Sequence, residues 1–310
     1  MFKEKSLVVH LSGGLGNQLF QFAAGLSLSE LTGKELVINN NLYKNPKFRN
    51  KGHPNYLSKR KYEIGDFKDL LRIKIDKAPT PVDGRFERAI NFLDEENKRK
   101  FGIATEMSFV EGSWIRPEKI SRLAGFFMSP KYFTNIRFEN RFQELNYALS
   151  KKTNDLIESL VQETTIAVHI RLTDYLAQNN YVVPSENYYL KSIKYLQEKI
   201  GLESKVYIFT DDLIMLKNKY PKIFSLGKCI GQTKQISPAE NLLLMSKSSG
   251  YVCSNSTYSW WATQLSGVQK NRIVYPSRFF INLGAPEQPS NLWDNNSRAF
   301  DSVSGEKIQL

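Results

Sequence analysis

Residues that commonly bind metals or form disulfides are scarce in this chain of 310 residues, which contains two cysteines and three histidines. Such a small set offers none of the ligand spacings of a structural zinc site. Cys229 and Cys253 each lie in or beside an apolar run typical of a strand, and two thiols are too few for the disulfide framework of a secreted domain. We therefore expect both cysteines to be buried and reduced.

Long apolar segments are also missing. No run approaches the roughly 18 residues that a bilayer-spanning helix needs. Glycines begin at Gly13, which is too early for the apolar core of a signal peptide. We expect a cytoplasmic protein.

Acidic residues are outnumbered, 31 against 43 lysines and arginines, which gives a formal net charge of +12. Such a surface attracts phosphate groups carried by a nucleic acid, an anionic membrane or a phosphorylated small molecule, although an ordinary solvated surface explains it equally well. The densest basic stretch, residues 43–61, mixes Lys and Arg with Asn, Pro and Gly, as a loop does. It has no helical stripe that could enter a DNA groove, and we predict no nucleic-acid partner.

The first glycine-rich turn, SGGLGNQ at 12–18, lacks the features of two common nucleotide-binding motifs. A dinucleotide fingerprint needs a third glycine where this chain has Leu19, and an acid after the next strand, which 35–41 does not provide. A P-loop closes on Gly-Lys-Ser/Thr, whereas this turn closes on Asn-Gln. We therefore predict a tight turn that approaches a ligand through Gly14, Gly16, Asn17 and Gln18, and the uncharged polar side chains there suit sugar hydroxyls.

The second half of the chain alternates strands and helices. Its helical patterns show an N-cap serine at Ser185, a proline at the first helical position at Pro238 and a terminal glycine at Gly267. This order predicts a parallel sheet with helices on both faces. The runs expected as strands are 164–170, 205–210, 251–254 and 272–276.

The first half starts with the same pattern and then becomes less regular. A strand at 6–11, a helix over about 17–31 and a strand at 35–39 are expected, with Gly33 ending the helix. We predict an α/β fold of two Rossmann-like lobes with a cleft between them. The predicted domains are an N-terminal lobe at 1–145, a C-terminal lobe at 146–284 and a tail at 285–310.

Ligands of open parallel sheets bind outside the carboxyl ends of the strands, so the residues that directly follow each run form the candidate site. These residues are polar after three of the four runs, and we expect them to face one crevice. They are His169, Arg171 and Asp174 at the end of the first run, Thr210, Asp211 and Asp212 at the end of the second, and Ser254, Asn255, Ser256 and Thr257 at the end of the third.

The chemistry of these side chains suits a nucleoside diphosphate. Arg171 carries a permanently charged planar fork that pairs with phosphate oxygens. Ser256 and Thr257 stand where a helix begins, and the free N–H groups of a helix N-terminus favour a second anion contact. Asp211 or Asp212 can accept hydrogen bonds from ribose hydroxyls or from guanine.

Each assignment also has a purely structural alternative. Asp174 can serve only to hold Arg171 in place. Asp211 and Asp212 can be acids of the kind favoured at the start of the next helix. Ser256 or Thr257 can be a plain N-cap, a role that is compatible with phosphate binding.

Five segments of the chain occur in a characteristic order: GGLGNQLFQFAAGLSLS near the N-terminus, GFFMSPKYF at 125–133, VHIRLTDY at 168–175, FTDD at 209–212 and SNSTYSWWATQL at 254–265. Together they resemble the family 11 glycosyltransferases, the α-1,2-fucosyltransferases. The likeness extends over most of the chain, from about residue 8 to residue 276. Any one segment is a weak match, whereas five in order are specific.

The resemblance implies a GT-B architecture, a GDP-β-L-fucose donor bound mainly by the C-terminal lobe, and inverting transfer to a sugar hydroxyl, commonly O2 of a galactose. No metal or other cofactor is expected, and the chain contains no Asp-x-Asp triad. Arg171 and His169 are the predicted catalytic residues, with Arg171 and a helix N-terminus stabilising the departing diphosphate. Members without an anchor resemble bacterial enzymes that extend lipid-linked O-antigen or capsule repeats, so peripheral contact with the inner face of an anionic membrane is also expected.

One departure from the family pattern concerns the donor. Animal-like members usually show His-x-Arg-Arg-Gly-Asp, whereas Leu172 and Thr173 replace the second arginine and the glycine here. Arg171 then binds the phosphate alone, and GDP-colitose or another GDP-sugar such as GDP-mannose stays an alternative donor. A non-catalytic polyanion-binding protein is the alternative from another class, but it gives no reason for polar residues to follow three strands.

Overall fold

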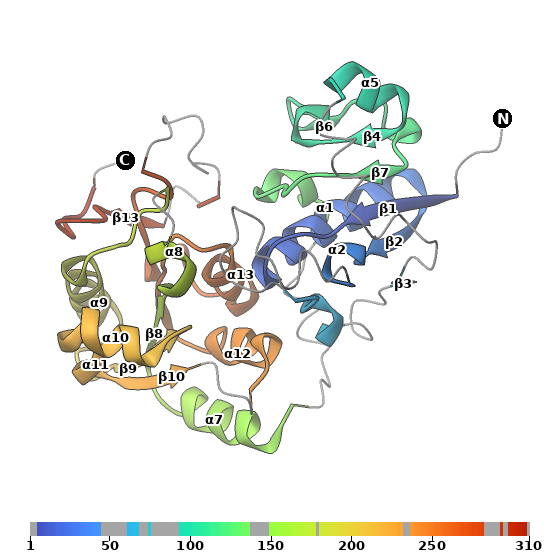
Figure 1. Cartoon of the computed structure of the whole chain (residues 1–310). Coiled ribbons are helices and arrows are strands. Elements are labelled where there is room, and N and C mark those ends of the chain that lie inside the picture. The colour runs from blue at the N-terminus through green and yellow to red at the C-terminus, as the bar shows by residue number, and fades with distance from the viewer. Residues whose placement is uncertain are drawn as a thin grey trace. The chain divides into compact units, whose positions relative to one another are not determined.

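The computed structural model describes residues 5–44, 61–67, 74–75, 93–136, 149–177, 180–231, 236–281, 292–293 and 297–308. The chain divides into two compact units, Met1–Arg141 and Phe142–Leu310 (Figure 1). Each unit is an α/β structure built on a parallel sheet, so the predicted pair of Rossmann-like lobes is confirmed. The boundary predicted between residues 145 and 146 lies outside the described residues.

The N-terminal unit is built on a five-stranded parallel sheet with the order β3-β2-β1-β7-β4. Helix α1 (Leu15–Thr32) follows β1 and is buried along most of its length. Gly33 ends this helix at a φ of 68°, in the left-handed region that glycine adopts at little cost. The strands are β1 (Ser6–His10), β2 (Glu35–Asn39), β3 (Lys74–Ile75), β4 (Ile103–Ala104) and β7 (Arg122–Leu123).

Short elements make up the remainder of the described N-terminal unit. Strands β5 (Phe109–Val110) and β6 (Ser113–Trp114) form an antiparallel hairpin. The short helices are α2 (Asn41–Lys44) and α5 (Glu95–Lys100), and the 3-10 turns are η1 (Ile64–Phe67), η2 (Glu106–Ser108), η3 (Pro117–Lys119) and η4 (Pro130–Phe133).

The C-terminal unit contains a six-stranded sheet with the order β10-β9-β8-β11-β12-β13, in which all neighbouring strands are parallel. The four predicted strands are all present. β8 is buried along its whole length, as expected for a central strand covered on both faces. The strands are β8 (Thr165–Ile170), β9 (Lys205–Thr210), β10 (Lys228–Gly231), β11 (Gly250–Val252), β12 (Ile273–Pro276) and β13 (Arg298–Phe300).

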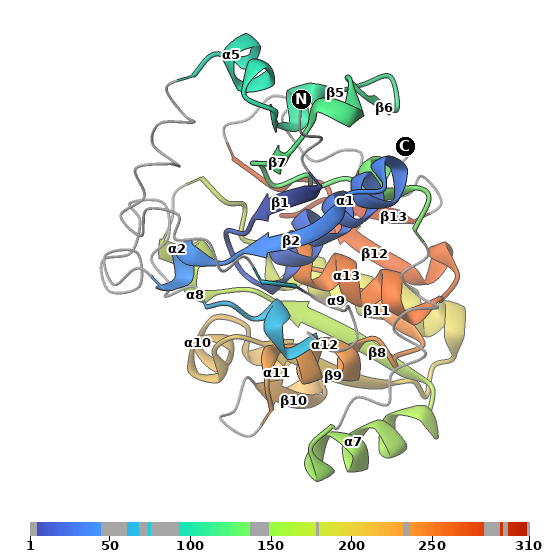
Figure 2. The same ribbon diagram turned by 90° about the vertical axis from the view of Figure 1, so that its right-hand side faces the viewer.

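Helices cover both faces of this sheet (Figure 1; Figure 2 gives the view turned by 90°). Because crossovers between parallel strands are right-handed, a reversal in the direction of strand addition moves the next helices to the opposite face. α9, α10 and α11 thus lie on one face, and α12 and α13 on the other. The helices are α7 (Lys151–Val161), α8 (Thr173–Ala177), α9 (Glu186–Ile200), α10 (Leu213–Lys219), α11 (Pro221–Leu226), α12 (Pro238–Met245) and α13 (Thr257–Ser266), and η5 (Lys270–Arg272) is a 3-10 turn.

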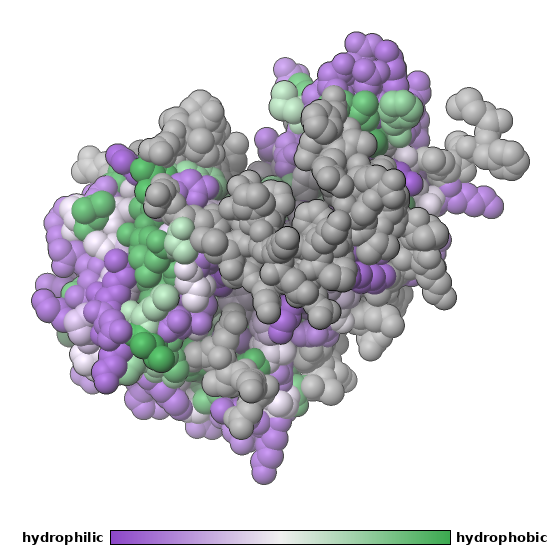
Figure 3. Space-filling model, in the orientation of Figure 1, coloured by the Kyte–Doolittle hydropathy of each residue, from purple (hydrophilic) through white to green (hydrophobic). Residues whose placement is uncertain are grey.

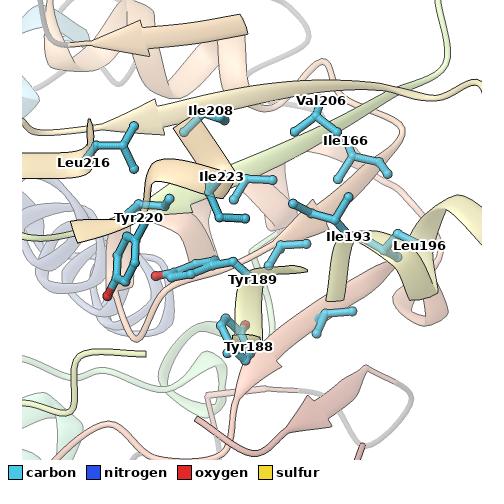
Figure 4. Close-up of a cluster of buried hydrophobic side chains, with 14 of the residues drawn as sticks. Ile166, Tyr188, Tyr189, Ile193, Leu196, Val206, Ile208, Leu216, Tyr220 and Ile223 are labelled. Atoms are coloured by element: carbon cyan, nitrogen blue, oxygen red, sulfur yellow. The ribbon is translucent and has the colours of Figure 1, made fainter. Parts of the chain in front are cut away.

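A continuous hydrophobic core lies between the sheet and the helices α9 to α11 (Figure 4). Apolar side chains of β8 and β9 form one side of this core. The tyrosines at the start of α9 pack against them, as do buried residues of α10 and α11. This packing fixes the strand ends from which the candidate site is built. Its labelled members are Ile166, Tyr188, Tyr189, Ile193, Leu196, Val206, Ile208, Leu216, Tyr220 and Ile223.

The segment predicted as a C-terminal tail supplies the edge strand of the sheet. β13 pairs with β12 in parallel register, and Phe300 also forms an antiparallel bridge with Lys307. Ala299 and Phe300 are buried by this pairing. A strand of three residues is too short to show a period of two in the sequence, which explains why the pattern did not reveal it.

None of the helices in the described ranges combines the length and the apolar character needed to cross a membrane. Both cysteines are free thiols. Cys253 is buried directly after β11, and Cys229 is half-buried in β10.

Candidate functional site

The strand order reverses at the centre of the C-terminal sheet. From β8 the chain adds β9 and then β10 on one side, and it returns to place β11 on the other side of β8. A reversal of this kind is the topological switch point at which open α/β sheets bind ligands, outside the carboxyl ends of the strands. The predicted site residues after β8 and β11 therefore flank the switch point.

Two hydrogen bonds connect the carboxyl end of β8 and the segment after it with the segment that follows β11. His169 Nδ1 lies 2.7 Å from Ser254 Oγ, and both side chains are buried. The Tyr175 hydroxyl, on α8, donates to the Asn255 carbonyl at 2.7 Å. Arg171 lies in the sequence between His169 and Tyr175, so this arginine is held beside the turn that leads into α13.

Burial governs the protonation state of His169. Desolvation, reinforced by the nearby Arg171 guanidinium, lowers the pKa of His169 to about 3. The ring packs beside Tyr258 at a centroid distance of 5.5 Å, and the Tyr258 hydroxyl is anchored by donating to the Pro238 carbonyl. The imidazole is therefore neutral near neutral pH and acts as a hydrogen-bonding group. Its predicted catalytic role stays a prediction.

The depressed pKa of His169 makes stability depend on pH in a defined direction. The neutral ring contributes stability that is fully present above the unfolded pKa of 6.5 and is lost as the pH falls toward the folded value of about 3. Between about pH 7 and about pH 5, we expect the free energy of unfolding of the wild type to fall by roughly 2 kcal/mol more than that of His169→Asn. Asparagine keeps a polar atom near the Nδ1 position, and urea unfolding across this pH range measures the difference. Parallel pH profiles for the two proteins would rule out a buried neutral His169.

Arg171 is the centre of a compact charge cluster. Its Nε lies 2.7 Å from Asp174 Oδ1 and 3.2 Å from Asp211 Oδ2. Burial alone would lower the pKa of Arg171, but the carboxylates of Asp211 and Asp174 raise it above its ordinary value, so the guanidinium stays charged. Both ion pairs pass through Nε, and the side chain is 18% exposed. Because Nε makes the contact given for each pair, the two terminal nitrogens of the guanidinium are the atoms proposed to bind an anion.

Asp211 and Asp212 have different partners although they are adjacent. Asp211 accepts hydrogen bonds from Leu172 N at 2.9 Å, Thr173 N at 3.3 Å and Thr173 Oγ1 at 2.6 Å, which ties the end of β9 to the turn after β8. Asp212 is the N-cap of α10 and accepts from the first backbone N–H groups of that helix. Thr210 is buried, and its hydroxyl accepts from Asp212 N at 3.3 Å. The N-cap alternative therefore describes Asp212, while Asp211 organises the Arg171 turn.

The turn after β11 is held by side-chain hydrogen bonds. Ser256 is the N-cap of α13, because its Oγ accepts from Tyr258 N at 3.3 Å, and Thr257 occupies the first helical position with partial exposure. Asn255 is fully buried, and its Nδ2 donates to the carbonyls of Val182 at 2.7 Å and Phe279 at 2.9 Å. The amide nitrogen of Asn255 thus ties this turn to two other segments, and the ligand contact predicted for Asn255 stays a prediction.

The glycine turn of the N-terminal unit is shaped by Gln18. Gly13 adopts a φ of +75°, and a Cβ there would lie 2.6 Å from Asn17 Nδ2, so this position requires glycine. Gln18 is fully buried. Its Oε1 accepts from Glu63 N and Ile64 N, and its Nε2 donates to the carbonyls of Lys61 and Gly13. Main-chain groups thus occupy the Gln18 amide, and the donor contact predicted for Gln18 stays a prediction.

An internal carboxylate occupies the start of α1. Leu15 N donates to Glu63 Oε2 at 2.9 Å, at the helix N-terminus where a P-loop would hold phosphate. Gly14 is the N-cap of this helix, Gly16 is buried in its first turn and Asn17 is partly exposed. No local pattern could have indicated this role of Glu63, because Glu63 lies 48 residues from its partner Leu15. Contacts of Gly14, Gly16 and Asn17 with a donor stay predictions.

The GFFMSPKYF segment has a local structural explanation in the N-terminal unit. Glu106 Oε1 accepts from Phe126 N at 2.6 Å and Phe127 N at 3.0 Å. A Cβ at Gly125 would lie 2.4 Å from the Glu106 carboxylate, so only glycine leaves room for it. Burial, together with this carboxylate, raises the pKa of Tyr132 to about 12. The motif thus forms a rigid turn against an aromatic cluster.

Comparisons with known proteins identify the family. The model of glycosyl transferase family 11 matches residues 115–279, more than half of the chain. An alpha-1,2-colitosyltransferase of Escherichia coli is 26% identical over 293 residues, which cover 88% of this chain and 92% of that protein. The O-antigen biosynthesis glycosyltransferase WbnK of Escherichia coli is 23% identical over 317 residues, covering 92% of this chain and 98% of that protein.

Among solved structures, the fucosyltransferase NodZ from Bradyrhizobium aligns with 84% of this chain and 93% of its own, at 13% identity and a TM-score of 0.46. The matched region of the family model contains the switch point between β8 and β11 and every predicted site residue of the C-terminal unit. The chain belongs to glycosyl transferase family 11.

Proposed function

We propose that this glycosyltransferase moves L-fucose from GDP-β-L-fucose to O2 of a galactose in an O-antigen or capsule repeat, with inversion at the anomeric carbon. The observation that carries the proposal is the Arg171 cluster at the strand-order reversal of a family 11 chain. A charged fork beside a helix N-terminus provides two anion contacts, which suits the diphosphate of a nucleotide sugar. The name of the related O-antigen glycosyltransferase supports the class of acceptor.

The proposed reaction is a single displacement. The acceptor hydroxyl oxygen forms a bond to the anomeric carbon of fucose, and the bond from that carbon to the diphosphate oxygen breaks. Attack from the opposite face converts the β linkage into an α linkage, GDP leaves with the bonding electron pair, and the acceptor proton passes to a base that we do not assign.

The chain's own groups stabilise the leaving diphosphate in this proposal. The terminal nitrogens of Arg171 pair with its oxygens, and the positive end of the α13 dipole favours the same charge. Asp174 and Asp211 hold the guanidinium in position before the donor arrives. In this proposal no metal or other cofactor takes part, because preorganised hydrogen-bond donors of the protein stabilise the charge of the leaving diphosphate.

GDP-colitose is the second candidate donor, and the related alpha-1,2-colitosyltransferase favours it. Colitose lacks the hydroxyl that fucose carries at C3. A site that hydrogen-bonds this hydroxyl rejects the deoxy sugar by about 10⁴- to 10⁵-fold, whereas a simple apolar wall discriminates by only about 10²-fold. The ratio of kcat/KM for the two donors therefore distinguishes a site that hydrogen-bonds the C3 hydroxyl from a site with only apolar groups near C3.

Donor binding is tested by thermal unfolding with GDP-fucose, GDP-colitose, GDP-mannose and a UDP-sugar. We expect GDP-fucose at about 100 times its Kd to stabilise the protein by roughly 2.7 kcal/mol, and the UDP-sugar to have no effect. Linkage analysis of the product on a galactose-terminated acceptor then checks the α-1,2 bond. Stabilisation by GDP-colitose alone would assign the second donor, and stabilisation by no GDP-sugar would contradict the proposed function.

The alternative of a non-catalytic polyanion binder makes a different prediction. Its affinity for duplex DNA would fall with salt, with a logarithmic slope of roughly 0.9 for each phosphate neutralised, and it would not distinguish between nucleotide sugars.

A further inference from the structure

Helix α10 exposes three consecutive large apolar side chains. Leu213 is 40%, Ile214 75% and Met215 39% exposed. Within the part of the chain that the structure describes, this is the only place where even two large apolar residues adjacent in the sequence are both exposed. Single exposed apolar residues are common on soluble proteins, whereas a contiguous group points to an interaction.

The exposure of this group does not result from loose packing of the helix. Leu216 on α10 and Tyr220 and Ile223 beside it are buried in the core (Figure 4). Ile214 precedes Leu216 by two positions, which is about 200° around a helix, and so it points away from the core. One side of the helix therefore packs into the core through Leu216, while the other side exposes Ile214 to solvent.

Lysines predominate among the charged residues around this group. Residues 213–239 contain five lysines and no aspartate or glutamate. Lys217, Lys219, Lys222 and Lys228 in this stretch are all exposed. The acids that face it, Asp212 and Glu186, are engaged with backbone N–H groups at the starts of α10 and α11.

We define the α10–α11 surface by its apolar and basic members, Leu213, Ile214, Met215, Leu226, Lys217, Lys219, Lys222 and Lys228. Hydrophobic and hydrophilic residues alternate over α10 and α11 in the space-filling view (Figure 3). We infer that this surface docks onto an anionic lipid membrane, with the apolar tip of α10 entering the interface and the lysines meeting the headgroups. A short apolar group within a field of lysines has the composition that interfacial membrane binding requires.

Docking through α10 has a consequence for the candidate site in the same unit. α10 begins two residues after Asp211, which holds the turn of Arg171. A membrane bound at α10 therefore lies next to the carboxyl ends of β8 and β9, where the donor is proposed to bind. The inference itself does not depend on the identity of the donor, since lipid binding is measured without it.

The test is co-sedimentation of the full chain with vesicles of phosphatidylcholine alone and of phosphatidylcholine with about one third phosphatidylglycerol. We expect binding to the anionic vesicles only, weakening as salt is raised. Ile214→Asp is expected to weaken partitioning by about tenfold, because it removes the inserted side chain and adds a repelled charge. Lys217→Gln and Lys222→Gln are each expected to weaken it by about fivefold.

Matched controls lie at the amino ends of two interior strands, whereas α10 begins at the carboxyl end of β9. Leu202, in the turn before β9, is 74% exposed, and Lys247 precedes β11. Leu202→Asp and Lys247→Gln should leave partitioning unchanged. An acid at position 214 suits the first turn of α10, so the variant should fold, and circular dichroism verifies this. Equal binding to neutral vesicles, no binding to either kind, or equal losses from Leu202→Asp and Ile214→Asp would each overturn the inference.

Discussion

Replacing Arg171 by lysine is expected to lower turnover of the GDP-sugar by about 10²- to 10³-fold while leaving the fold intact. Lysine keeps a positive charge between Asp174 and Asp211, so neither nearly buried carboxylate loses its counter-charge. It replaces a planar fork by a single ammonium, which cannot face the two carboxylates and a diphosphate in the same geometry. Initial rates at saturating acceptor, together with thermal unfolding, measure the two effects separately.

Two further variants make this result interpretable. Arg171→Ala leaves two carboxylates without their partner and is expected to cost about 3–5 kcal/mol of stability, so its activity alone would say little. Arg272→Lys, at the amino end of β12, is a matched control that should leave the rate unchanged. Activity of Arg171→Lys within about threefold of the wild type would remove Arg171 from the proposed role.

The same substitution at two adjacent acids is expected to change the free energy of unfolding by very different amounts. Asp211→Asn should lower the free energy of unfolding by about 3 kcal/mol, because it removes a charge paired with Arg171 and turns an amide toward the backbone donors of Leu172 and Thr173. Asp212→Asn should change it by less than about 0.5 kcal/mol, because asparagine caps a helix as well as aspartate does.

Urea unfolding of both variants at neutral pH measures the difference in stability, and Asp212→Asn serves as the control for Asp211→Asn. Similar losses at the two positions would show that Asp211 does not organise the turn after β8. The comparison also isolates donor binding, since a weaker donor response in the stable Asp212→Asn protein would support the nucleotide contact predicted for Asp212.

Local signals in the sequence were sufficient for most elements of the C-terminal unit. Ser185 caps α9, the Ser237-Pro238 pair starts α12 with a capping box, and Gly267 closes α13 in the left-handed conformation. Each of these depends on contacts within one turn of helix, which a pattern of neighbouring residues records. The alternation of such helices with apolar runs then predicts the parallel sheet.

Side-chain roles that depend on distant partners could not be predicted in this way. The amide of Gln18 meets the backbone at Glu63, 45 residues away, and that of Asn255 meets Val182, 73 residues away. Nothing in the local pattern distinguishes an amide aimed at a ligand from one aimed at another loop. For the same reason the sequence pattern does not distinguish Asp211 from Asp212. In the structure Asp211 binds the turn after β8, whereas Asp212 caps α10.

The Arg171 cluster has more negative than positive charge, since one guanidinium faces the two carboxylates of Asp174 and Asp211. Free inorganic phosphate and sulfate have only the guanidinium hydrogen bonds to offset repulsion by the two carboxylates, so we expect them to bind weakly to this cluster. A nucleotide sugar adds base, ribose and hexose contacts to the directional bonds of the guanidinium fork. We therefore expect the compensation of charge inside the cluster to weaken competition by small inorganic anions.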